Sequence, residues 1–518
     1  MGAARVTNQT DNPKATTVAR NVLWNWSGIG VQMAIGVVVA PFLIRRLGDE
    51  GYGIWILVGS LTSYFGLLEL GLRASMGRHI AFHRAQHDSA GVNAILNTAI
   101  AAECVTAIVI AALTAAGAIL FPRFFDVSPT HLHEARIALL LVGLNLAFTL
   151  PLAIFDSVLW AFQRFDLINL IDIPIGVARM AALFYFLPRG HGLIAVAVIA
   201  ILSTTLGALL KMILSLRVEP TLRLSFASIH AAAARQLYSF GVWSFLLSMA
   251  RRTRGYFSPL LIGALISVEV VTLYSIASRL IGYAIQIVVA TTGVLTPVAT
   301  VLHAQAKKEE QERLFLEGGK YCSAVALFFL LAFAFLGHSF ITLWIGPKQA
   351  HAAILLNILS VGEVLPMSQW VTYSMILAMA RHRLSALVAL VEVVLMIALM
   401  LILVRPMGMT GVCIGIAIAG TGCRGIFQVI YGCRLMGVTL QTYFAQAFLR
   451  PLLLAAASAI AMAALHPWSA PETWRTLIAY ATIFTVLYFG LALVVLGGLA
   501  RLRLSRARLA SSAAAQAP

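Results

Sequence analysis

Long apolar runs dominate the chain, and polar residues gather mainly in short stretches between them. About 20 apolar residues in a helix cross the ~30 Å hydrocarbon core of a bilayer, and a helix satisfies its own backbone hydrogen bonds there. The pattern therefore predicts an all-α, polytopic membrane protein with about fourteen transmembrane helices. We place these helices at residues 22–43, 53–73, 94–121, 136–160, 167–187, 192–215, 237–263, 270–301, 320–345, 353–379, 384–404, 410–433, 450–466 and 476–500.

Composition supports a lipid environment for most of the surface. Hydrophobic residues make up 60% of the chain and charged residues 11%, whereas soluble proteins carry roughly 25% charged residues. The net charge of +17 would favour nucleic acid in a soluble protein, but most of the positive residues here lie in short loops. We therefore predict the bilayer as a partner and no nucleic acid. The five cysteines lie in or beside apolar runs without a CxxC motif, so we predict no disulfide framework and no metal site.

The distribution of arginine and lysine predicts the orientation. One set of alternate loops is rich in these residues, for example at Arg217, Arg223 and Arg235, and the other set is poorer. Positive loops stay on the cytoplasmic side, and the rich set includes both ends of the chain. Both termini are therefore predicted to be cytoplasmic, and an even number of helices requires the same arrangement.

A weak internal repeat predicts two similar lobes. Residue pairs recur at an offset of 217 or 218 positions, as in Arg164 with Arg381 and Gly190 with Gly408. Six helices per repeat keep both copies in the same orientation, as in transporters whose halves rock about a central site. The predicted organisation is a cytoplasmic tail at 1–20, an N-lobe of six helices at 21–217, a cytoplasmic linker at 218–236, a C-lobe of six helices at 237–434, two further helices within 435–500, and a basic cytoplasmic tail at 501–518.

Arginines inside the predicted spans are the strongest candidate site residues. An arginine at the bilayer centre costs roughly 2.5–3.5 kcal/mol even on an insertion scale, so such residues should face a wet cavity or an acidic partner. The predicted site residues are Arg251, Arg252, Arg254, Arg279 and Arg424. A guanidinium group suits phosphate because its planar fork donates two parallel hydrogen bonds and stays charged. We therefore predict a cationic cavity for an anionic ligand such as pyrophosphate. The alternative is helix–helix packing, which explains the accompanying Ser and Gly residues.

Acidic residues in the spans are candidates for ion coupling. We single out Glu69, Asp172 and Glu363 as residues that relay a proton or bind Na⁺. Each is equally explained as an ion-pair partner of a nearby cation. No phosphate-binding lysine loop, zinc-protease motif or nucleophile elbow occurs, so we predict that the chain is not an enzyme and needs no cofactor beyond a coupling ion.

Several motifs resemble polysaccharide-export flippases of the Wzx type, within the multidrug/oligosaccharidyl-lipid/polysaccharide exporter superfamily. They are PFLIRRLGDEGYGIW at 41–55, LLELGLRASMGRHIA at 67–81, WAFQRFDLIN at 160–169, YSIASRL at 274–280, TPVATVLHAQ at 296–305 and PMGMTGVCIGIA at 406–417. The chain departs from the family pattern at Glu69, where Asp is more usual.

The resemblance implies a fold and an activity. It implies a two-lobed, fourteen-helix protein of the bacterial inner membrane that flips an undecaprenyl-pyrophosphate-linked oligosaccharide by alternating access. A polymerase and glycosyltransferases of the same pathway are the implied partners. Two alternatives stay open: a cation-coupled multidrug exporter of the same superfamily, and a non-transporting membrane subunit of a glycan-assembly complex.

Overall fold

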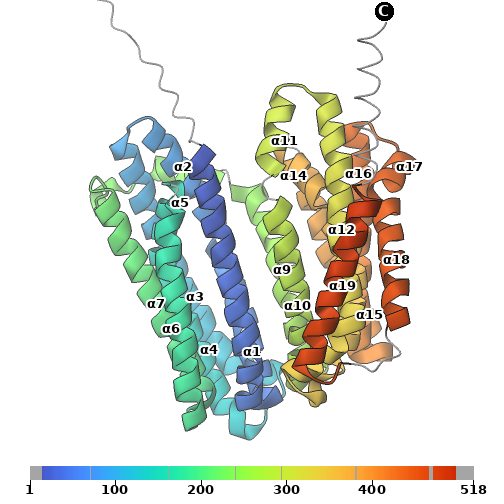
Figure 1. Cartoon of the computed structure of the whole chain (residues 1–518). Coiled ribbons are helices and arrows are strands. Elements are labelled where there is room, and N and C mark those ends of the chain that lie inside the picture. The colour runs from blue at the N-terminus through green and yellow to red at the C-terminus, as the bar shows by residue number, and fades with distance from the viewer. Residues whose placement is uncertain are drawn as a thin grey trace, which may run out of the picture. The chain divides into compact units, whose positions relative to one another are not determined.

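Helices are the only regular elements in the part of the chain that the structure describes. The structure is a computed structural model, and it describes residues 15–69, 72–162, 164–239, 241–292, 295–379, 382–465 and 471–497. The predicted basic tail at 501–518 and most of the predicted N-terminal tail lie outside these residues. The helices form two compact units (Figure 1).

The first unit contains the described residues of Met1–Leu47, Phe65–Pro122 and Ser128–Phe245. Its helices are the first part of α1 (Ala15–Phe65), α2 (Leu72–Ala85), α3 (Ser89–Phe124), α4 (Pro129–Leu152), α5 (Ile154–Ala161), α6 (Phe165–Phe186), α7 (Gly192–Val218) and α8 (Ala231–Ser239). α7 packs against α4, α5 and α6. A buried cluster around Met76, Leu96 and Val158 joins α2, α3 and α5.

The predicted linker at 218–236 is held against α3 of the same unit. The Asn93 side chain donates to Thr221 O at 2.9 Å and accepts from Arg223 N at 2.7 Å. One turn later, Asn97 donates to Arg223 O at 2.8 Å and accepts from Ser225 N at 2.9 Å. Two amide side chains therefore satisfy the backbone groups of the linker between Thr221 and Ser225. The linker becomes helical at α8.

The second unit contains the described residues of Gly48–Tyr64, Arg123–Val127 and Leu246–Pro518. Its helices are the remainder of α1, α9 (Gly241–Leu265), α10 (Val268–Thr292), α11 (Leu295–Ala304), α12 (Lys308–Trp344), α13 (Ala352–Ser368), α14 (Trp370–Ala378), α15 (His382–Gly420), the π-helix η5 (Thr421–Phe427), α16 (Gln428–Met436), α17 (Leu440–Tyr443), the π-helix η6 (Phe444–Phe448), α18 (Leu449–Leu465) and α19 (Trp474–Val495). α12 packs against α13, α18 and α19.

Gly48 marks the point where α1 passes from the first unit to the second. Its backbone angles of φ 72° and ψ 177° are not helical, and only glycine adopts such a positive φ without strain. Beyond it, α1 packs closely on α10, because a Cβ atom on Gly53 would lie 2.1 Å from the carbonyl oxygen of Val268. In the LGDEGYGIW motif, Gly48 therefore allows a bend and Gly53 allows a close helix contact.

Eleven helical segments among the described residues are long and apolar enough to span a bilayer. The difference from the predicted fourteen has identifiable sources. Gly48 and Gly408 bend two long segments that each cover two predicted spans. α9, which corresponds to the predicted helix at 237–263, carries three arginines and is too polar to qualify. The predicted all-α architecture is confirmed, and the count of fourteen stays a prediction.

One repeated position has a glycine with positive φ in both copies. Gly190 follows α6 with φ +85°, and Gly408 bends α15 with φ +56°. These two glycines are 218 positions apart, and each follows a proline by two residues. The positive φ gives a physical reason for glycine at both positions, while the predicted lobe boundaries stay a prediction.

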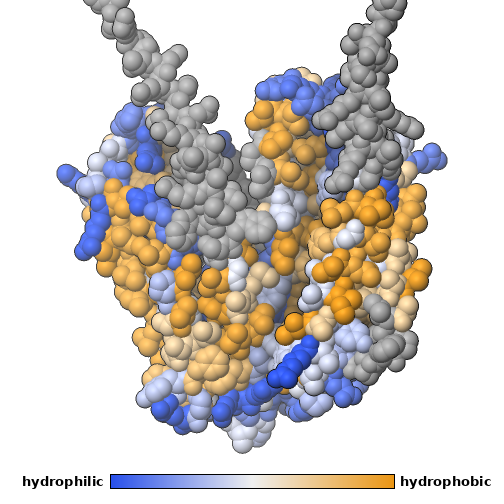
Figure 2. Space-filling view, in the orientation of Figure 1, coloured by the Kyte–Doolittle hydropathy of each residue, from blue (hydrophilic) through white to orange (hydrophobic). Residues whose placement is uncertain are grey.

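The outer surfaces of the helices suit lipid. Ile108 is 72% exposed, Ile402 65% and Leu493 76%, and contiguous apolar exposure of this kind is rare on soluble monomers. On the face that Figure 2 draws, hydrophobic side chains cover the flanks of the helices and hydrophilic ones gather near their ends. The charged stretch that begins at Lys308 forms the first turns of α12 and continues into the span without a break in the helix.

Candidate functional site

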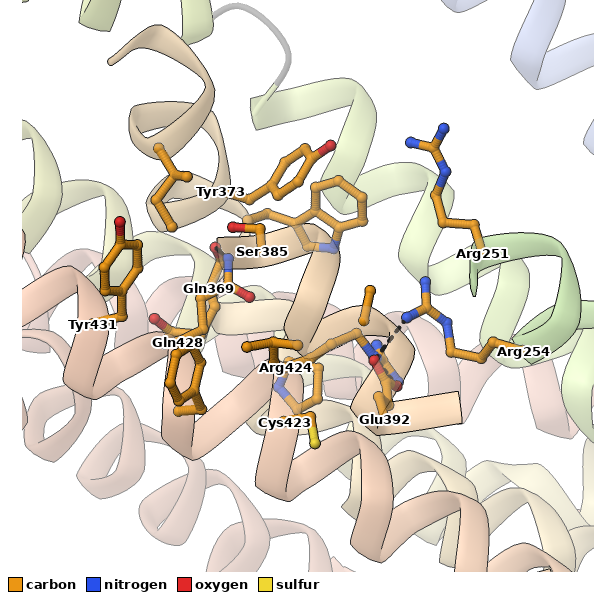
Figure 3. A pocket seen from close by; sticks show the side chains of 16 residues that line it. Arg251, Arg254, Gln369, Tyr373, Ser385, Glu392, Cys423, Arg424, Gln428 and Tyr431 are labelled. Carbon is orange, nitrogen blue, oxygen red and sulfur yellow. Dashed lines mark hydrogen bonds and ion pairs between the residues drawn. The ribbon is translucent and has the colours of Figure 1, made fainter. Parts of the chain in front are cut away.

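The second unit contains a cavity lined by residues of α9, α13, α14, α15, η5 and α16. It holds about 860 Å³ of empty space including its open mouth. Its polar groups are unevenly distributed (Figure 3). We call Arg251, Arg254, Glu392 and Arg424 the charged side, and Gln369, Trp370, Tyr373, Phe427, Gln428 and Tyr431 the aromatic side.

Arg424 is the centre of the charged side. Its guanidinium donates from Nη1 to Glu363 Oε2 at 2.9 Å and from Nη2 to Glu363 Oε1 at 2.5 Å. A third hydrogen bond runs from Nε to Glu392 Oε1 at 2.7 Å, and Arg254 Nη1 donates to Glu392 Oε2 at 3.0 Å. Because these residues come from α9, α13, α15 and η5, one ion-pair network connects four segments of the second unit.

Local backbone structure positions Arg424. It lies in the π-helix η5, a wide helical turn that is frequent at functional sites. A Cβ atom on Gly420, one turn earlier, would lie 2.7 Å from Arg424 Nη2. The glycine therefore leaves the space in which the guanidinium meets both carboxylates.

The charges of this network cancel, so the cavity is less cationic than its arginines alone would make it. Arg254 and Arg424 carry two positive charges, and Glu363 and Glu392 carry two negative ones. The Glu392 side chain is 2% exposed, and it pairs with two guanidinium groups, which offsets the cost of burying a carboxylate. Arg251 lines the same cavity and is exposed. These four residues and Arg251 therefore carry a net charge of +1, whereas the three arginines alone would carry +3.

The aromatic side consists of two ring pairs and two amides. The rings of Trp370 and Tyr373 meet edge to face, with centroids 5.6 Å apart at 76°. Phe427 and Tyr431 are stacked, with centroids 6.0 Å apart at 13°. Gln369 is almost fully buried. The cavity therefore combines aromatic rings and guanidinium groups in one lining.

The other two predicted arginines do not line this cavity. Arg252 Nη1 donates to the carbonyl oxygen of Ser63 at 3.2 Å. Arg279 Nη2 donates to the hydroxyl of Tyr52 at 3.1 Å. Both partners lie on the part of α1 that belongs to the second unit, so these arginines fix that segment to α9 and α10.

The three predicted coupling acids lie in different surroundings. Glu363 is bound by Arg424, as described above. Glu69 ends the short 3₁₀ helix Gly66–Glu69 and is 8% exposed. Asp172 lies in the first unit, where Lys211 Nζ is 3.0 Å from its carboxylate and 2.8 Å from Asp156 Oδ1. One lysine thus serves two carboxylates, and this cluster carries a net negative charge.

Sequence reasoning missed Lys211 and the aromatic side of the cavity. Lys211 interrupts the apolar run LGALLKMILSL. Because a lysine inside the membrane is costly, as an arginine is, the same argument identifies Lys211 as a candidate. Trp370 and Tyr373 carry no such signal, because aromatic residues are common in apolar helices. Only the fold brings them to the same cavity as Arg254.

Comparison with known proteins places the chain in a family. A family model described as "Polysaccharide biosynthesis protein" matches residues 18–303. The chain is 22% identical over 416 residues to a Shigella flexneri protein named "Putative O-antigen transporter", covering 77% of this chain and 94% of that protein. It is 21% identical over 482 residues to the "Uncharacterized membrane protein EpsK" of Bacillus subtilis (strain 168), covering 90% of this chain and 92% of that protein.

Solved structures share the fold. The lipid II flippase MurJ in an inward closed conformation aligns with a TM-score of 0.70 at 14% identity, over 93% of this chain and 99% of MurJ. A multidrug resistance MATE family transporter in an inward-facing conformation aligns with a TM-score of 0.69 at 16% identity, over 79% of this chain and 94% of that chain. At these identities the likeness shows a common membrane-protein fold.

Proposed function

Because the chain belongs to the polysaccharide biosynthesis protein family, we propose that it is a flippase for an undecaprenyl-pyrophosphate-linked oligosaccharide. In this proposal it moves the head group from the cytoplasmic to the outer leaflet of a bacterial inner membrane, with both termini in the cytoplasm. The Shigella flexneri relative named "Putative O-antigen transporter" supports this class of cargo. Glycosyltransferases would supply the substrate and a polymerase would consume it.

One observation carries the proposal: three arginines line a single cavity in a protein whose outer surfaces suit lipid. Maintaining guanidinium groups at membrane depth is costly, and the cavity gives them a polar space in which to bind an anion. Pyrophosphate accepts bidentate hydrogen bonds from arginine. A multidrug exporter for cationic compounds would instead need an acidic cavity, and this one has a positive net charge.

Alternating access gives the route across the membrane in this proposal. The chain forms two compact units, and in transporters built from two lobes one lobe rocks against the other. No covalent step is required, because the cargo changes leaflet without changing its bonds. The charged head group would be carried through a polar space, while the lipid chain stays in the hydrocarbon.

Asp172 is the strongest candidate for ion coupling. The Asp156, Lys211 and Asp172 cluster has an unbalanced negative charge, and its carboxylates are 42% and 33% exposed. A proton or Na⁺ would neutralise it. Glu363, in contrast, is already neutralised by Arg424. We therefore expect an Asp172→Asn variant to lose the dependence of transport on an ion gradient, and a pH gradient and a Na⁺ gradient imposed separately would identify the ion.

Reconstitution tests the flippase proposal directly. Lipid-linked oligosaccharide extracted from cells that lack the transporter is placed in proteoliposomes with the purified protein, and its arrival in the opposite leaflet is measured. We expect Arg251→Gln to slow transfer at least about tenfold, because a lost charged contact of about 1.4 kcal/mol changes a rate by that factor. Arg313→Gln is the control, since Arg313 is exposed at the start of α12 and far along the chain from the cavity segments.

Two results would contradict the proposal. Absence of transfer by the wild-type protein, in liposomes where the protein is folded, would favour a non-transporting subunit. Equal transfer by wild type and Arg251→Gln would remove the cavity from the mechanism. Arg252→Gln separates helix packing from substrate binding among the α9 arginines. Arg252 donates to the carbonyl oxygen of Ser63 and does not line the cavity.

A further inference from the structure

The linker between α7 and α8 carries exposed apolar and exposed basic side chains at one end of the first unit. We propose that it is a binding surface for anionic phospholipid, with its apolar side chains among the acyl chains and its arginines on the phosphate head groups. Lipid binding at this place is independent of the transported cargo. The linker surface is defined as Arg217, Arg223, Leu224, Phe226, Ile229 and Arg235.

The linker has an inner side fixed to the first unit and an outer side open to its surroundings. Leu222, Ala233 and Leu237 belong to a buried cluster of that unit, and α8 packs on α2. Phe226, in contrast, is 93% exposed and Leu224 is 54% exposed. Hydrogen bonds to two asparagines of α3 hold the backbone on both sides of Leu224. The outward placement of these apolar side chains is therefore a fixed feature of the fold.

The attachment points on α3 give the depth of the linker. Asn97 and Thr98, which accept hydrogen bonds from linker backbone N–H groups, stand directly before the apolar run at 99–121. This run is long enough to cross the ~30 Å hydrocarbon core. On the other side of the linker, Arg217 lies in the last turn of α7. The linker therefore lies where the spans end, at the level at which amphipathic segments meet lipid.

The exposed apolar side chains favour contact with acyl chains. Exposed apolar residues on the flanks of the spans face lipid, but Phe226 lies outside the spans and would face water if the linker stood clear of the membrane. Moving apolar surface out of water is favourable. Ile229, which is 39% exposed, extends the apolar part of the linker surface beyond Phe226. An amphipathic segment of this kind lies in the membrane interface with its apolar residues inward.

The three arginines supply charge complementarity to an anionic head group. Arg217, Arg223 and Arg235 are exposed, and none of their guanidinium groups is in an ion pair or hydrogen bond with another described residue. The linker carries a single carboxylate, that of Glu219, which accepts a hydrogen bond from the Thr221 hydroxyl at 2.6 Å. The linker surface is therefore positive, and guanidinium groups donate paired hydrogen bonds to phosphate oxygens.

Other occupants fit less well. A zwitterionic phospholipid would cover the apolar side chains but would bring no net negative charge to the three arginines. An acidic protein segment would pair with the arginines but would also have to cover Phe226. Lipid already surrounds α3 and α7, on which the linker lies, so anionic phospholipid meets both requirements without a further partner.

Hydrogen exchange of the backbone amides tests this surface in the intact protein. The full-length chain is placed in nanodiscs of phosphatidylcholine alone, or of equal parts phosphatidylcholine and phosphatidylglycerol with the same acyl chains. Exchange is then followed by mass spectrometry. We expect amides within 221–230 to exchange at least about fivefold more slowly in the anionic nanodiscs, since each arginine near an anionic surface contributes about that factor in affinity. The exposed turn at 305–308 is the internal control and should exchange equally in both.

Matched variants identify the groups responsible. Arg223→Gln/Arg235→Gln should lose most of the difference between the two kinds of nanodisc. Lys308→Gln/Arg313→Gln removes the same charge from exposed positions of α12 and should keep the wild-type difference. Phe226→Ser should exchange faster than wild type in both kinds of nanodisc, because its side chain no longer holds the linker among the acyl chains. All the substituted side chains are exposed, so the fold is retained.

The contrary outcomes are distinct. Equal exchange of the wild-type linker in both kinds of nanodisc would overturn the binding of anionic lipid. Slow exchange that survives Arg223→Gln/Arg235→Gln would do the same, because the arginines would then have no part in it. Protection seen in native membrane vesicles, but not in nanodiscs of equal anionic content, would assign the surface to an acidic protein and overturn the lipid assignment. Each of these results would leave the flippase proposal intact.

Discussion

Arg424 donates two hydrogen bonds to the carboxylate of Glu363, at 2.9 and 2.5 Å, and these two residues come from η5 and α13. Both side chains are largely buried, with 22% and 13% exposed. Arg424 therefore has a structural role in the second unit as well as a place in the cavity. Any test of the cavity must separate these two contributions.

Removing one partner of this pair should cost more stability than removing both. Glu363→Gln leaves a buried guanidinium without its main partner, and breaking a buried pair in this way costs about 3–5 kcal/mol. The double variant Glu363→Met/Arg424→Met removes both charges and should recover much of that loss. The measurement is the apparent melting temperature of the protein purified in detergent.

An exposed ion pair serves as the control for that comparison. Lys307 Nζ lies 3.1 Å from Glu310 Oε1, with both side chains about half exposed, and such pairs contribute roughly 0–1 kcal/mol. Glu310→Gln should therefore shift the melting temperature very little. A double Met variant that is less stable than Glu363→Gln would show that the network is held by packing rather than by charge compensation.

Lys211 makes a second prediction in the first unit. Lys211→Met leaves two carboxylates close together without a cation, and their repulsion should destabilise the protein by about 1–3 kcal/mol, since partial exposure of the carboxylates screens them. Adding Asp172→Asn should restore stability by removing one of the two charges. A Lys211→Met protein as stable as wild type in detergent would mean that water alone compensates both carboxylates.

The sequence predicted the helices better than it predicted the site, for physical reasons. Apolar runs specify spans because each helix satisfies its own backbone, whatever its neighbours are. The cost of a charge in the membrane singled out Arg251, Arg254 and Arg424, which the structure brings to one cavity, and their role as site residues stays a prediction. The same cost could not place Arg252 and Arg279, because a guanidinium is equally well satisfied by the carbonyl oxygen of Ser63 or the hydroxyl of Tyr52.

The acids were harder still, since their roles depend on partners far away in the chain. Glu392 is 138 positions from Arg254 and 32 from Arg424, and no local pattern connects them. For the same reason, the sequence did not identify Lys211, which lies 39 positions away, as the ion-pair partner of Asp172. The substrate and coupling roles of all these residues stay predictions.

The linker contacts give a third prediction. Asn97→Ala removes two hydrogen bonds from the backbone of Arg223 and Ser225, so this segment should open more often. Limited trypsin digestion of the detergent-solubilised protein should then cut after Arg223 several times faster than in wild type. Asn145→Ala is a matched control, because Asn145 also joins two helices, through Thr204 and Thr205, but does not touch the linker. Equal cleavage of Asn97→Ala and wild type would mean that other contacts hold the linker.

Two glycines on the same segment of α1 should respond differently to an added methyl group. A Cβ on Gly53 would lie 2.1 Å from the carbonyl oxygen of Val268, whereas nothing lies within 4 Å of a Cβ on Gly59. Gly53→Ala must therefore push α1 away from α10, and overpacking of this kind costs about 1–3 kcal/mol. Gly59→Ala should be neutral or stabilising by about 0.5–1 kcal/mol, because alanine loses less entropy in a helix. Thermal unfolding in detergent measures both, and equal shifts for the two variants would mean that α1 does not pack on α10 as closely as the structure has it.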